Sequence, residues 1–210
     1  MKIEFISDVV CPWCAIGLHA LERAIERIGA ELSVELQFRA FELNPQMAAE
    51  GEDLTEYLGR KYGLAPQQLE HNQATLRARA AAVGFEMGIR TRIWNSFDAH
   101  RLIHWAGLEG RQRQLKHGLL RACHGRNENI SSREVLLRVA REAALDGQQA
   151  DEVLESGRYG DEVRRCEHRW ERLGIHAVPS LLIDGEYLIQ GGHPPETFEQ
   201  ALRQLGGAAG

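Results

Sequence analysis

Two stretches near the start of the chain alternate apolar and polar residues, and a helical pattern lies between them. Residues 2–7 (Lys-Ile-Glu-Phe-Ile-Ser) have the two-residue period of a half-buried strand, and the alternation returns over residues 34–40. Between these stretches, apolar residues recur at helical spacing from Leu18 to Ile28 and stop at Gly29. The first forty residues therefore predict a strand–helix–strand unit of the kind that a right-handed crossover joins.

The middle of the chain, from about residue 46 to 175, predicts helix after helix with polar connections. Asp53 and Ser131 each stand three residues before a glutamate, which is the spacing of a capping box. We expect both residues to mark helix starts. This helical block interrupts the sheet that the first forty residues begin.

Beyond Gly174 the pattern predicts strands again. Residues 180–183 form a short apolar run, Asp184-Gly185 is a two-residue hairpin signal, and residues 187–189 supply the returning strand. A last helix begins at Pro194-Pro195-Glu196. Two antiparallel strands and a helix therefore complete the sheet.

The predicted fold is α/β, in the order strand, helix, strand, helical block, strand, strand, helix. We expect residues 1–45 and 176–210 to form one sheet-containing domain, with residues 46–175 inserted as a helical domain. A chain of 210 residues with 43% hydrophobic content can bury a substantial core. We therefore expect a single folding unit.

Charge and apolar patterning exclude several function classes. The formal net charge is −5 and the pI is about 6.0, which gives no electrostatic reason to expect nucleic acid or an anionic membrane as a partner. The chain opens directly into a strand pattern, without a basic and apolar leader, and has no run of about eighteen apolar residues. We therefore expect a cytoplasmic protein without membrane segments.

The segment Cys11-Pro12-Trp13-Cys14 lies where the first strand gives way to the first helix. With Cys11 as N-cap, Pro12 falls at the first helical position, where its missing N–H costs nothing. The thiolate is the attacking species, and a helix N-terminus stabilises negative charge. We therefore predict Cys11 as a nucleophile with a pKa in the range of about 3.5–7.5 found at such sites, and Cys14 as the resolving thiol.

The other two cysteines, Cys123 and Cys166, lie alone in segments predicted as helices. In a reducing compartment, free thiols are the simplest interpretation, and nothing in the sequence supports a bridge between them. A structural zinc site needs a second pair of ligands at suitable spacing, which neither Cys123-His124 nor Cys166-Glu167-His168 resembles. We predict no metal site.

Four segments carry a resemblance to a known family: Cys11-Pro12-Trp13-Cys14-Ala15-Ile16-Gly17, Phe41-Glu42-Leu43-Asn44-Pro45, Ala99-His100-Arg101 and Val178-Pro179-Ser180. Together they resemble the cytoplasmic, FrnE-like branch of the DsbA-like thioredoxin superfamily, over almost the entire chain. The resemblance implies a thioredoxin fold with a large helical domain inserted between its two halves. It also implies thiol–disulfide oxidoreductase activity.

The resemblance further implies a cis peptide bond between Val178 and Pro179, next to the active cysteines. The Val178 backbone would then be free to hydrogen-bond an extended substrate segment beside Cys11. The implied substrate is a disulfide or dithiol, either a protein or glutathione, with no cofactor beyond glutathione as a co-substrate. The oligomeric state stays open. Ala15 and Gly191-Gly192-His193 depart from the usual family pattern on the substrate-facing side.

Four polar residues are further candidates near the cysteines. His100 either faces a substrate cleft or is a hydrogen-bonded packing histidine. Asn44 either lines that cleft or shapes the exit from the second strand, and His193 is a candidate to approach the active loop. We expect Asp8 to have a turn or cap role, because a carboxylate beside Cys11 raises the thiol pKa and opposes its activation.

Two other function classes compete with disulfide exchange. Kappa-class glutathione transferases and 2-hydroxychromene-2-carboxylate isomerases share the inserted thioredoxin architecture, use glutathione, and carry a serine near the place of Cys11. The presence of both Cys11 and Cys14 favours redox exchange. A non-catalytic interaction module is the third class, but incidental cysteines rarely flank Pro-Trp at a helix start.

Overall fold

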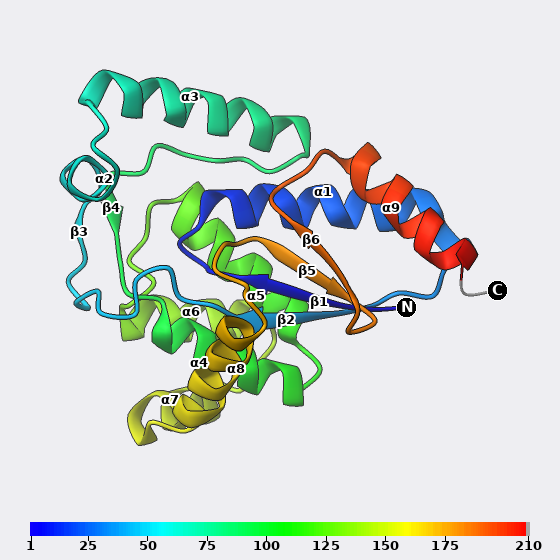
Figure 1. Ribbon diagram of the computed structural model, residues 1–210. Coiled ribbons are helices and arrows are strands. Elements are labelled where there is room, and N and C mark those ends of the chain that lie inside the picture. The colour runs from blue at the N-terminus through cyan, green and yellow to red at the C-terminus, as the bar shows by residue number, and fades with distance from the viewer. Residues whose placement is uncertain (209–210) are drawn as a thin grey trace.

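The computed structural model describes residues 1–208 and contains the predicted four-stranded sheet (Figure 1). The strands lie in the order β2-β1-β5-β6, with β1 parallel to β2 and antiparallel to β5. The elements of this part are β1 (Lys2–Ser7), α1 (Pro12–Ile28), a 3-10 turn (Gly29–Glu31), β2 (Glu35–Ala40), β5 (Ser180–Ile183), β6 (Tyr187–Gln190) and α9 (Pro195–Ala208). The α/β fold with a helical insertion is therefore confirmed.

The insertion is largely helical, as predicted. Its elements are β3 (Glu52–Asp53), α2 (Leu54–Tyr62), α3 (Pro66–Ala82), β4 (Arg92–Ile93), α4 (Phe97–Leu108), α5 (Gln112–Leu120), a π-helical turn (Arg121–Gly125), α6 (Arg133–Glu142), α7 (Gly147–Ser156) and α8 (Gly160–Arg172). The antiparallel β3–β4 pair was not predicted. Strands of two residues are too short to show an alternating pattern.

Helices cover both sides of the sheet (Figure 1). Helices α1 and α9 pack together on one side, while α4 and α8 lie on the other and contact β2. Helix α3 runs beyond α1, on the outer side, and contacts it. The end of the sheet where α1 begins is therefore covered by the insertion.

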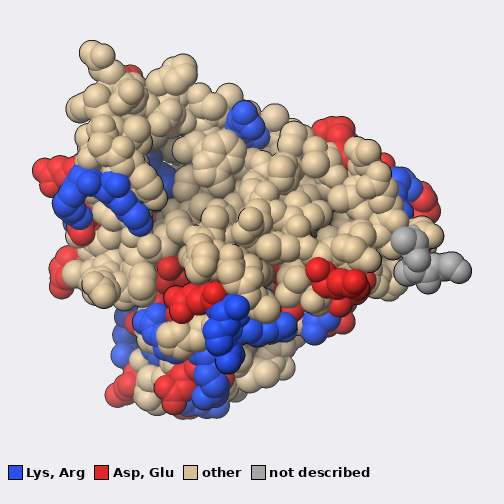
Figure 2. All heavy atoms as spheres, in the orientation of Figure 1, with Lys and Arg blue, Asp and Glu red and all other residues tan. Residues whose placement is uncertain are grey.

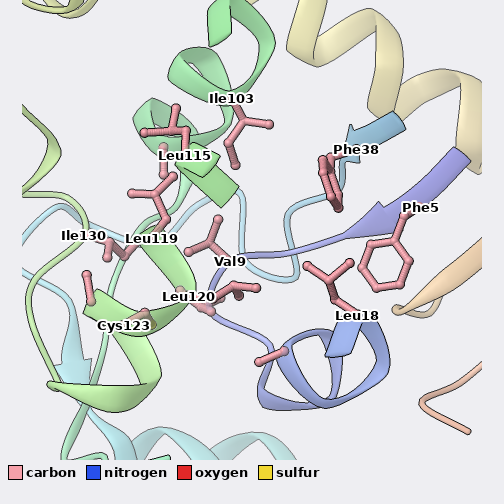
Figure 3. Close-up of a cluster of buried hydrophobic side chains, with 14 of the residues drawn as sticks. Phe5, Val9, Leu18, Phe38, Ile103, Leu115, Leu119, Leu120, Cys123 and Ile130 are labelled. Atoms are coloured by element: carbon pink, nitrogen blue, oxygen red, sulfur yellow. The ribbon is translucent and has the colours of Figure 1, made fainter. Parts of the chain in front are cut away.

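The core is continuous from the sheet into the insertion (Figure 3). Phe5 and Phe38 of adjacent strands meet edge to face with ring centroids 6.2 Å apart. Val9 lies between them and the leucines of α5, Leu115 and Leu119. This shared core supports the expectation of one folding unit, because the inserted helices bury apolar surface against the sheet rather than only against each other.

Of the three turn and capping signals read from the sequence, the Asp53 cap and the Asp184-Gly185 hairpin are confirmed, and the helix start at Ser131 is wrong. Asp53 is the N-cap of α2, and its carboxylate accepts hydrogen bonds from the N–H groups of Thr55 and Glu56. Asp184 and Gly185 both have positive φ, as the central residues of a tight hairpin turn require. Ser131 does not cap a helix: α6 follows Ser132, and the Ser131 hydroxyl instead donates to the Asn95 carbonyl over 2.8 Å.

The segment that leaves β2 is tied to α8 by charged side chains. The Glu42 N–H donates to Glu167 Oε1 over 3.0 Å, and Arg164 pairs with both carboxylates. Burial raises the pKa of Glu42 to about 6, and the nearby Glu167 charge adds to this, although His100 and Arg164 oppose it. Glu42 is therefore half-protonated just below neutral pH.

We expect Glu42→Gln to change the pH dependence of stability. Because the pKa of Glu42 is higher in the folded state, its unfavourable contribution appears as pH rises from about 4.5 to 6. Over that window the difference in the free energy of unfolding, variant minus parent, should increase by about 1–2 kcal/mol. Urea unfolding at stepped pH measures this difference.

Glu128→Gln is the control, with the opposite sign. Burial raises the pKa of Glu128, but Arg126 and Arg138 outweigh it and leave the pKa lowered. The stabilising contribution of the Glu128 carboxylate is therefore present at neutral pH and lost in acid. The free energy of unfolding of Glu128→Gln should accordingly decrease relative to that of the parent as pH rises. A Glu42→Gln difference that stays constant with pH would contradict the assignment.

Candidate active site

The turn between β1 and α1 presents the two cysteines as the sequence predicts. Cys11 is the N-cap residue with extended backbone (φ −84°, ψ 115°), and Pro12 opens the helix. The Cys14 N–H donates to the Cys11 carbonyl over 3.1 Å. Both cysteines are free thiols; Cys14 is fully buried, and Cys11 is 4% exposed.

The Cys11 thiol faces the loop before β5. Its sulfur donates to the Val178 carbonyl over 3.7 Å, and the Val178–Pro179 peptide bond is cis. Gly17 allows this approach, because a Cβ there would lie 3.1 Å from Pro179 Cγ. The helix that carries the cysteines and the Val178–Pro179 loop are therefore in close contact.

The surroundings shift the pKa values of the two thiols in opposite directions. The Cys14 thiol lowers the pKa of Cys11 by hydrogen bonding to its sulfur; burial and the Asp8 charge raise it, and the N–H groups of Cys14 and Trp13 lower it. The pKa of Cys11 is lowered overall. Burial, followed by the hydrogen bond and charge of Cys11, raises the pKa of Cys14 well above its ordinary value. Cys11 is therefore the thiol that ionises first.

Asp8 anchors the turn from inside the protein. Its carboxylate accepts hydrogen bonds from the Leu43 N–H over 2.7 Å and from the Val10 N–H over 3.3 Å, and His100 Nε2 lies 3.3 Å from it. Burial raises the pKa of Asp8, but the hydrogen bond and charge of His100, with the Leu43 N–H, outweigh it and leave the pKa lowered. Asp8 thus has the expected turn role.

Two buried residues that the sequence analysis missed also hold or tune this turn. His124, in the π-helical turn, donates from Nε2 to the Val9 carbonyl over 2.7 Å, and burial lowers its pKa well below the ordinary value. Lys116 is only 1% exposed, and burial lowers its pKa while the charges of Cys14 and Asp8 raise it. Lys116 in turn lowers the pKa of Cys14. The only sequence signal was a lysine beside Leu115 on the apolar face of a helix.

A cavity of about 620 Å³ opens beside the cysteines. Cys11, Pro12, Trp13 and Val178 form one wall, and α2 and α3 form the wall opposite. Much of the lining is leucine, from Leu43, Leu54, Leu58, Leu64, Leu69 and Leu76. Figure 2 shows a hollow on this face, between the part that contains α2 and α3 and the middle of the molecule.

The remaining candidate residues differ in where they lie. Asn44 lines the cavity, and its Oδ1 accepts hydrogen bonds from Tyr57 and, over 2.8 Å, from Lys61. His100 is buried behind Asp8 and is not among the cavity-lining residues of the described chain. His193 donates to the Gln190 carbonyl over 2.8 Å, and it too is outside the lining found within residues 1–208.

The other two cysteines are not among the residues found to line the cavity within residues 1–208. Cys123 and Cys166 are both free thiols. Burial raises the pKa of Cys123 to about 11, and burial likewise raises the pKa of Cys166. Residues 1–208 contain no group of three or more potential metal-ligating His, Cys, Asp or Glu side chains.

A Cys-X-X-Cys pair at the start of α1, a loop with a cis-proline against it, and a sheet interrupted by helices define a thioredoxin-like protein of the DsbA type. The family model for the DSBA-like thioredoxin domain matches residues 2–203, and the chain belongs to this family. A probable DsbA oxidoreductase from Streptomyces coelicolor superposes with a TM-score of 0.92 at 34% identity, covering 97% of this chain and 89% of that one.

More distant relatives share the fold. The uncharacterized protein YwbO of Bacillus subtilis is 27% identical over 205 residues, 96% of each chain. The cytosolic disulfide reductase DsbM of Pseudomonas aeruginosa, solved with GSH, has a TM-score of 0.67 at 16% identity and 98% coverage of both chains. A 2-hydroxychromene-2-carboxylate isomerase has a TM-score of 0.72 at 14% identity, covering 98% of this chain and 96% of that one. No helix within residues 1–208 has the length and apolar content to cross a bilayer.

Proposed function

We propose that this protein is a thiol–disulfide oxidoreductase in which Cys11 is the nucleophile and Cys14 the resolving thiol. The observation that carries the proposal is the placement of Cys11 as the N-cap of α1, with its thiol against the cis Val178–Pro179 loop. The directions of the pKa shifts agree with it, lowered for Cys11 and raised for Cys14. Cys11 also lines the cavity, whereas Cys14 is buried behind it. A substrate disulfide therefore meets the more reactive sulfur first.

The reaction is a pair of displacements. The Cys11 thiolate attacks one sulfur of the substrate disulfide, whose S–S bond breaks, and the other half leaves as a thiolate. Cys14 then loses its proton and attacks the Cys11 sulfur, which releases the second half as a thiolate. The substrate gains two electrons and the protein is left with a Cys11–Cys14 disulfide. A low-molecular-weight thiol or dithiol reduces that disulfide, and the reverse sequence oxidises a dithiol substrate.

The buried charges around the turn support the second displacement. Cys14 must lose its proton inside the protein, where burial disfavours the thiolate. The Lys116 ammonium lowers the pKa of Cys14 and so favours the attacking form. The Asp8 charge, in contrast, raises the pKa of Cys11 and so limits the acidity of that thiol.

The finer assignments belong to the same proposal. We place the protein in the FrnE-like branch and in the cytoplasm, with glutathione as a co-substrate, and the Val178 backbone as a hydrogen-bond partner for the substrate. A cytosolic disulfide reductase solved with GSH has this fold, which supports the cytoplasmic location and glutathione. The FrnE-like branch rests on the four sequence segments that carry the resemblance, and the role of Val178 rests on the cis peptide bond that follows it, against Cys11. No resident cofactor or metal is part of the proposed reaction.

The test is a redox titration combined with an activity assay. Equilibration against mixtures of oxidised and reduced glutathione, followed by acid quenching and alkylation, should reveal one two-electron couple, with the new disulfide between Cys11 and Cys14 by peptide mapping. Turnover of 2-hydroxyethyl disulfide with glutathione should accompany it. A protein whose Cys11 and Cys14 stay reduced under all conditions, and which turns over no disulfide, would refute the function.

A glutathione-using transferase or isomerase predicts a different pattern. Such an enzyme binds and activates the glutathione thiol and has no need of a second protein sulfur. Conjugating or isomerising activity that survives replacement of Cys14 would favour that class over disulfide exchange.

A further inference from the structure

Arg90 is a buried cation that the proposed chemistry does not use. It lies between α3 and β4, is 7% exposed, and contributes to the lining of the cavity beside Cys11. Its Nε and Nη2 atoms are buried and have no hydrogen-bond partner within residues 1–208. No carboxylate of that part of the chain lies within salt-bridge distance of its guanidinium.

The backbone that carries Arg90 is held firmly. Gln73 of α3 both accepts from the Arg90 N–H over 3.3 Å and donates to the Arg90 carbonyl over 3.2 Å. Two residues earlier, the Gly88 N–H donates to the His124 carbonyl over 2.8 Å. A Cβ at Gly88 would lie 2.3 Å from the Gly125 carbonyl oxygen, so glycine is needed for this approach. The backbone is therefore fixed at the arginine and two residues before it.

Burial of two guanidinium nitrogens without an anionic partner is costly, because no hydrogen bond replaces the hydration that they lose. Arginine recognises carboxylates with two parallel hydrogen bonds, and these are among the strongest that proteins make. The cavity wall offers a further donor: Asn44 Nδ2 is also buried without a hydrogen-bond partner in the described chain. Both features suit an anionic group that enters from the cavity.

We propose that the cavity binds one half of a low-molecular-weight disulfide, in which an apolar group is followed by a carboxylate that pairs with Arg90. This rests on the proposed disulfide exchange and names its substrate class. The volume of about 620 Å³ falls in the range of small-molecule sites, and the leucine-rich lining suits an apolar group. Arg90 is then the residue that selects the substrate, while Cys11 performs the chemistry.

The surroundings favour a small molecule over a protein chain. Cys11 is only 4% exposed, so a substrate sulfur has to enter the cavity to reach it. Lys and Arg side chains also flank the hollow in Figure 2: the exposed Lys61 donates to Asn44 over 2.8 Å, and the exposed Arg79 lies over the Trp13 ring, 5.4 Å from its centroid. These exposed cations favour the approach of an anionic ligand, and Arg90 is the buried cation that it meets in the wall.

The exchange test compares two disulfides that differ only in charge, 4,4′-dithiodibenzoate and 4,4′-dithiodibenzamide. Arg90→Gln should lower kcat/KM for the dibenzoate by about ten- to a hundredfold, the loss expected for one charge-assisted pair, and change that for the dibenzamide less than about twofold. Arg90→Lys should recover part of the preference for the dibenzoate, because it keeps the charge but not the planar fork. Arg111→Gln, at an exposed arginine outside the cavity, should leave both substrates unchanged.

A binding test keeps this inference separate from the proposed function. 4-(Methylthio)benzoate and its amide contain no disulfide, so calorimetric titration reports recognition even if exchange were absent. The parent should bind the benzoate at least about tenfold more tightly than the amide, and Arg90→Gln should abolish that difference.

Four outcomes would overturn the proposal, three of them through Arg90 and one through the substrate class. Equal losses for both disulfides would mean that Arg90 acts through the Cys11 thiol, and equal binding of benzoate and benzamide by the parent would mean that it recognises no carboxylate. A large fall in the melting temperature of Arg90→Gln would mean that the protein itself holds the guanidinium. Faster reduction of a protein disulfide such as that of insulin than of either small disulfide would place a polypeptide in the cavity instead.

Discussion

Cys11→Ser is expected to lower the rate of disulfide exchange by roughly three orders of magnitude or more, the scale of effect seen when an enzyme loses its nucleophile. A serine hydroxyl does not ionise near neutral pH, so the lowered pKa that prepares Cys11 for attack has no counterpart in the variant. The first displacement is then blocked, and neither a small disulfide nor a protein disulfide is reduced. Coupled turnover of 2-hydroxyethyl disulfide with glutathione measures the loss.

The matched control is Cys166→Ser. Cys166 is a partly exposed thiol in α8 whose pKa is raised by burial, and it does not line the cavity described within residues 1–208. Its replacement should leave turnover within about twofold of the parent, since surface substitutions away from a site have small effects. Retention of more than a tenth of the activity in Cys11→Ser would mean that another group attacks the substrate.

The sheet could be predicted because its signals are local. Alternation over residues 2–7 and 34–40 predicts β1 and β2, and Asp184-Gly185 lies between two strands of matching length. The expectation that β1 is half-buried was wrong: residues 3–7 are all buried, because β1 is a central strand whose Glu4 pairs with Arg39 and Arg169. The β3–β4 pair escaped because two residues carry no period. The prediction that Ser131 marks a helix start was wrong because its hydroxyl donates to the carbonyl of Asn95, 36 residues earlier in the chain. The spacing of a capping box gives no information about such tertiary contacts.

The active site likewise combines features that the sequence could predict with contacts that it could not. Cys11 and Cys14 stand three residues apart at a strand–helix boundary, so their chemistry follows from sequence order. Asp8 and His100, which lie together, are 92 residues apart in the chain. The charge of Lys116, on an inserted helix, lowers the pKa of Cys14. Nothing in the periodicity of either segment marks such a contact. Arg90 was missed for the same reason, because an unpaired buried arginine is visible only once its surroundings are known.

The insertion gives the thioredoxin-like turn its specific properties. The turn contributes the two sulfurs and the helix N-terminus. His100 and His124, both from inserted helical segments, hold Asp8 and Val9 beneath it, while Lys116 adds a positive charge. Most of the cavity lining also comes from the insertion, including residues of α2 and α3. In the proposed function, the helical insertion therefore determines which substrate enters and adjusts the acidity of Cys14, while the turn after β1 supplies the nucleophile.

Cys14→Ser is expected to separate the two displacements. The first should survive, because Cys11 stays in place and a serine hydroxyl can still hydrogen-bond its sulfur. The second should stop, so the substrate half remains attached to Cys11 as a mixed disulfide. A single equivalent of leaving thiol should appear in a burst, followed by turnover at least about a hundredfold slower than in the parent, limited by external thiols. Intact-mass spectrometry of the acid-quenched protein identifies the adduct.

The comparison of Cys14→Ser with Cys14→Ala tests why Cys11 is acidic. The Cys14 thiol is the largest influence that lowers the pKa of Cys11, and alanine removes this donor while serine keeps one. The pKa of Cys11, followed by thiolate absorbance, should therefore rise more in Cys14→Ala than in Cys14→Ser. In both variants the burst rate at acid pH should fall in proportion to the thiolate lost. Equal pKa values in the two variants would assign the acidity to the helix N-terminus alone, and a Cys14→Ser protein that forms no adduct would leave Cys14 without a resolving role.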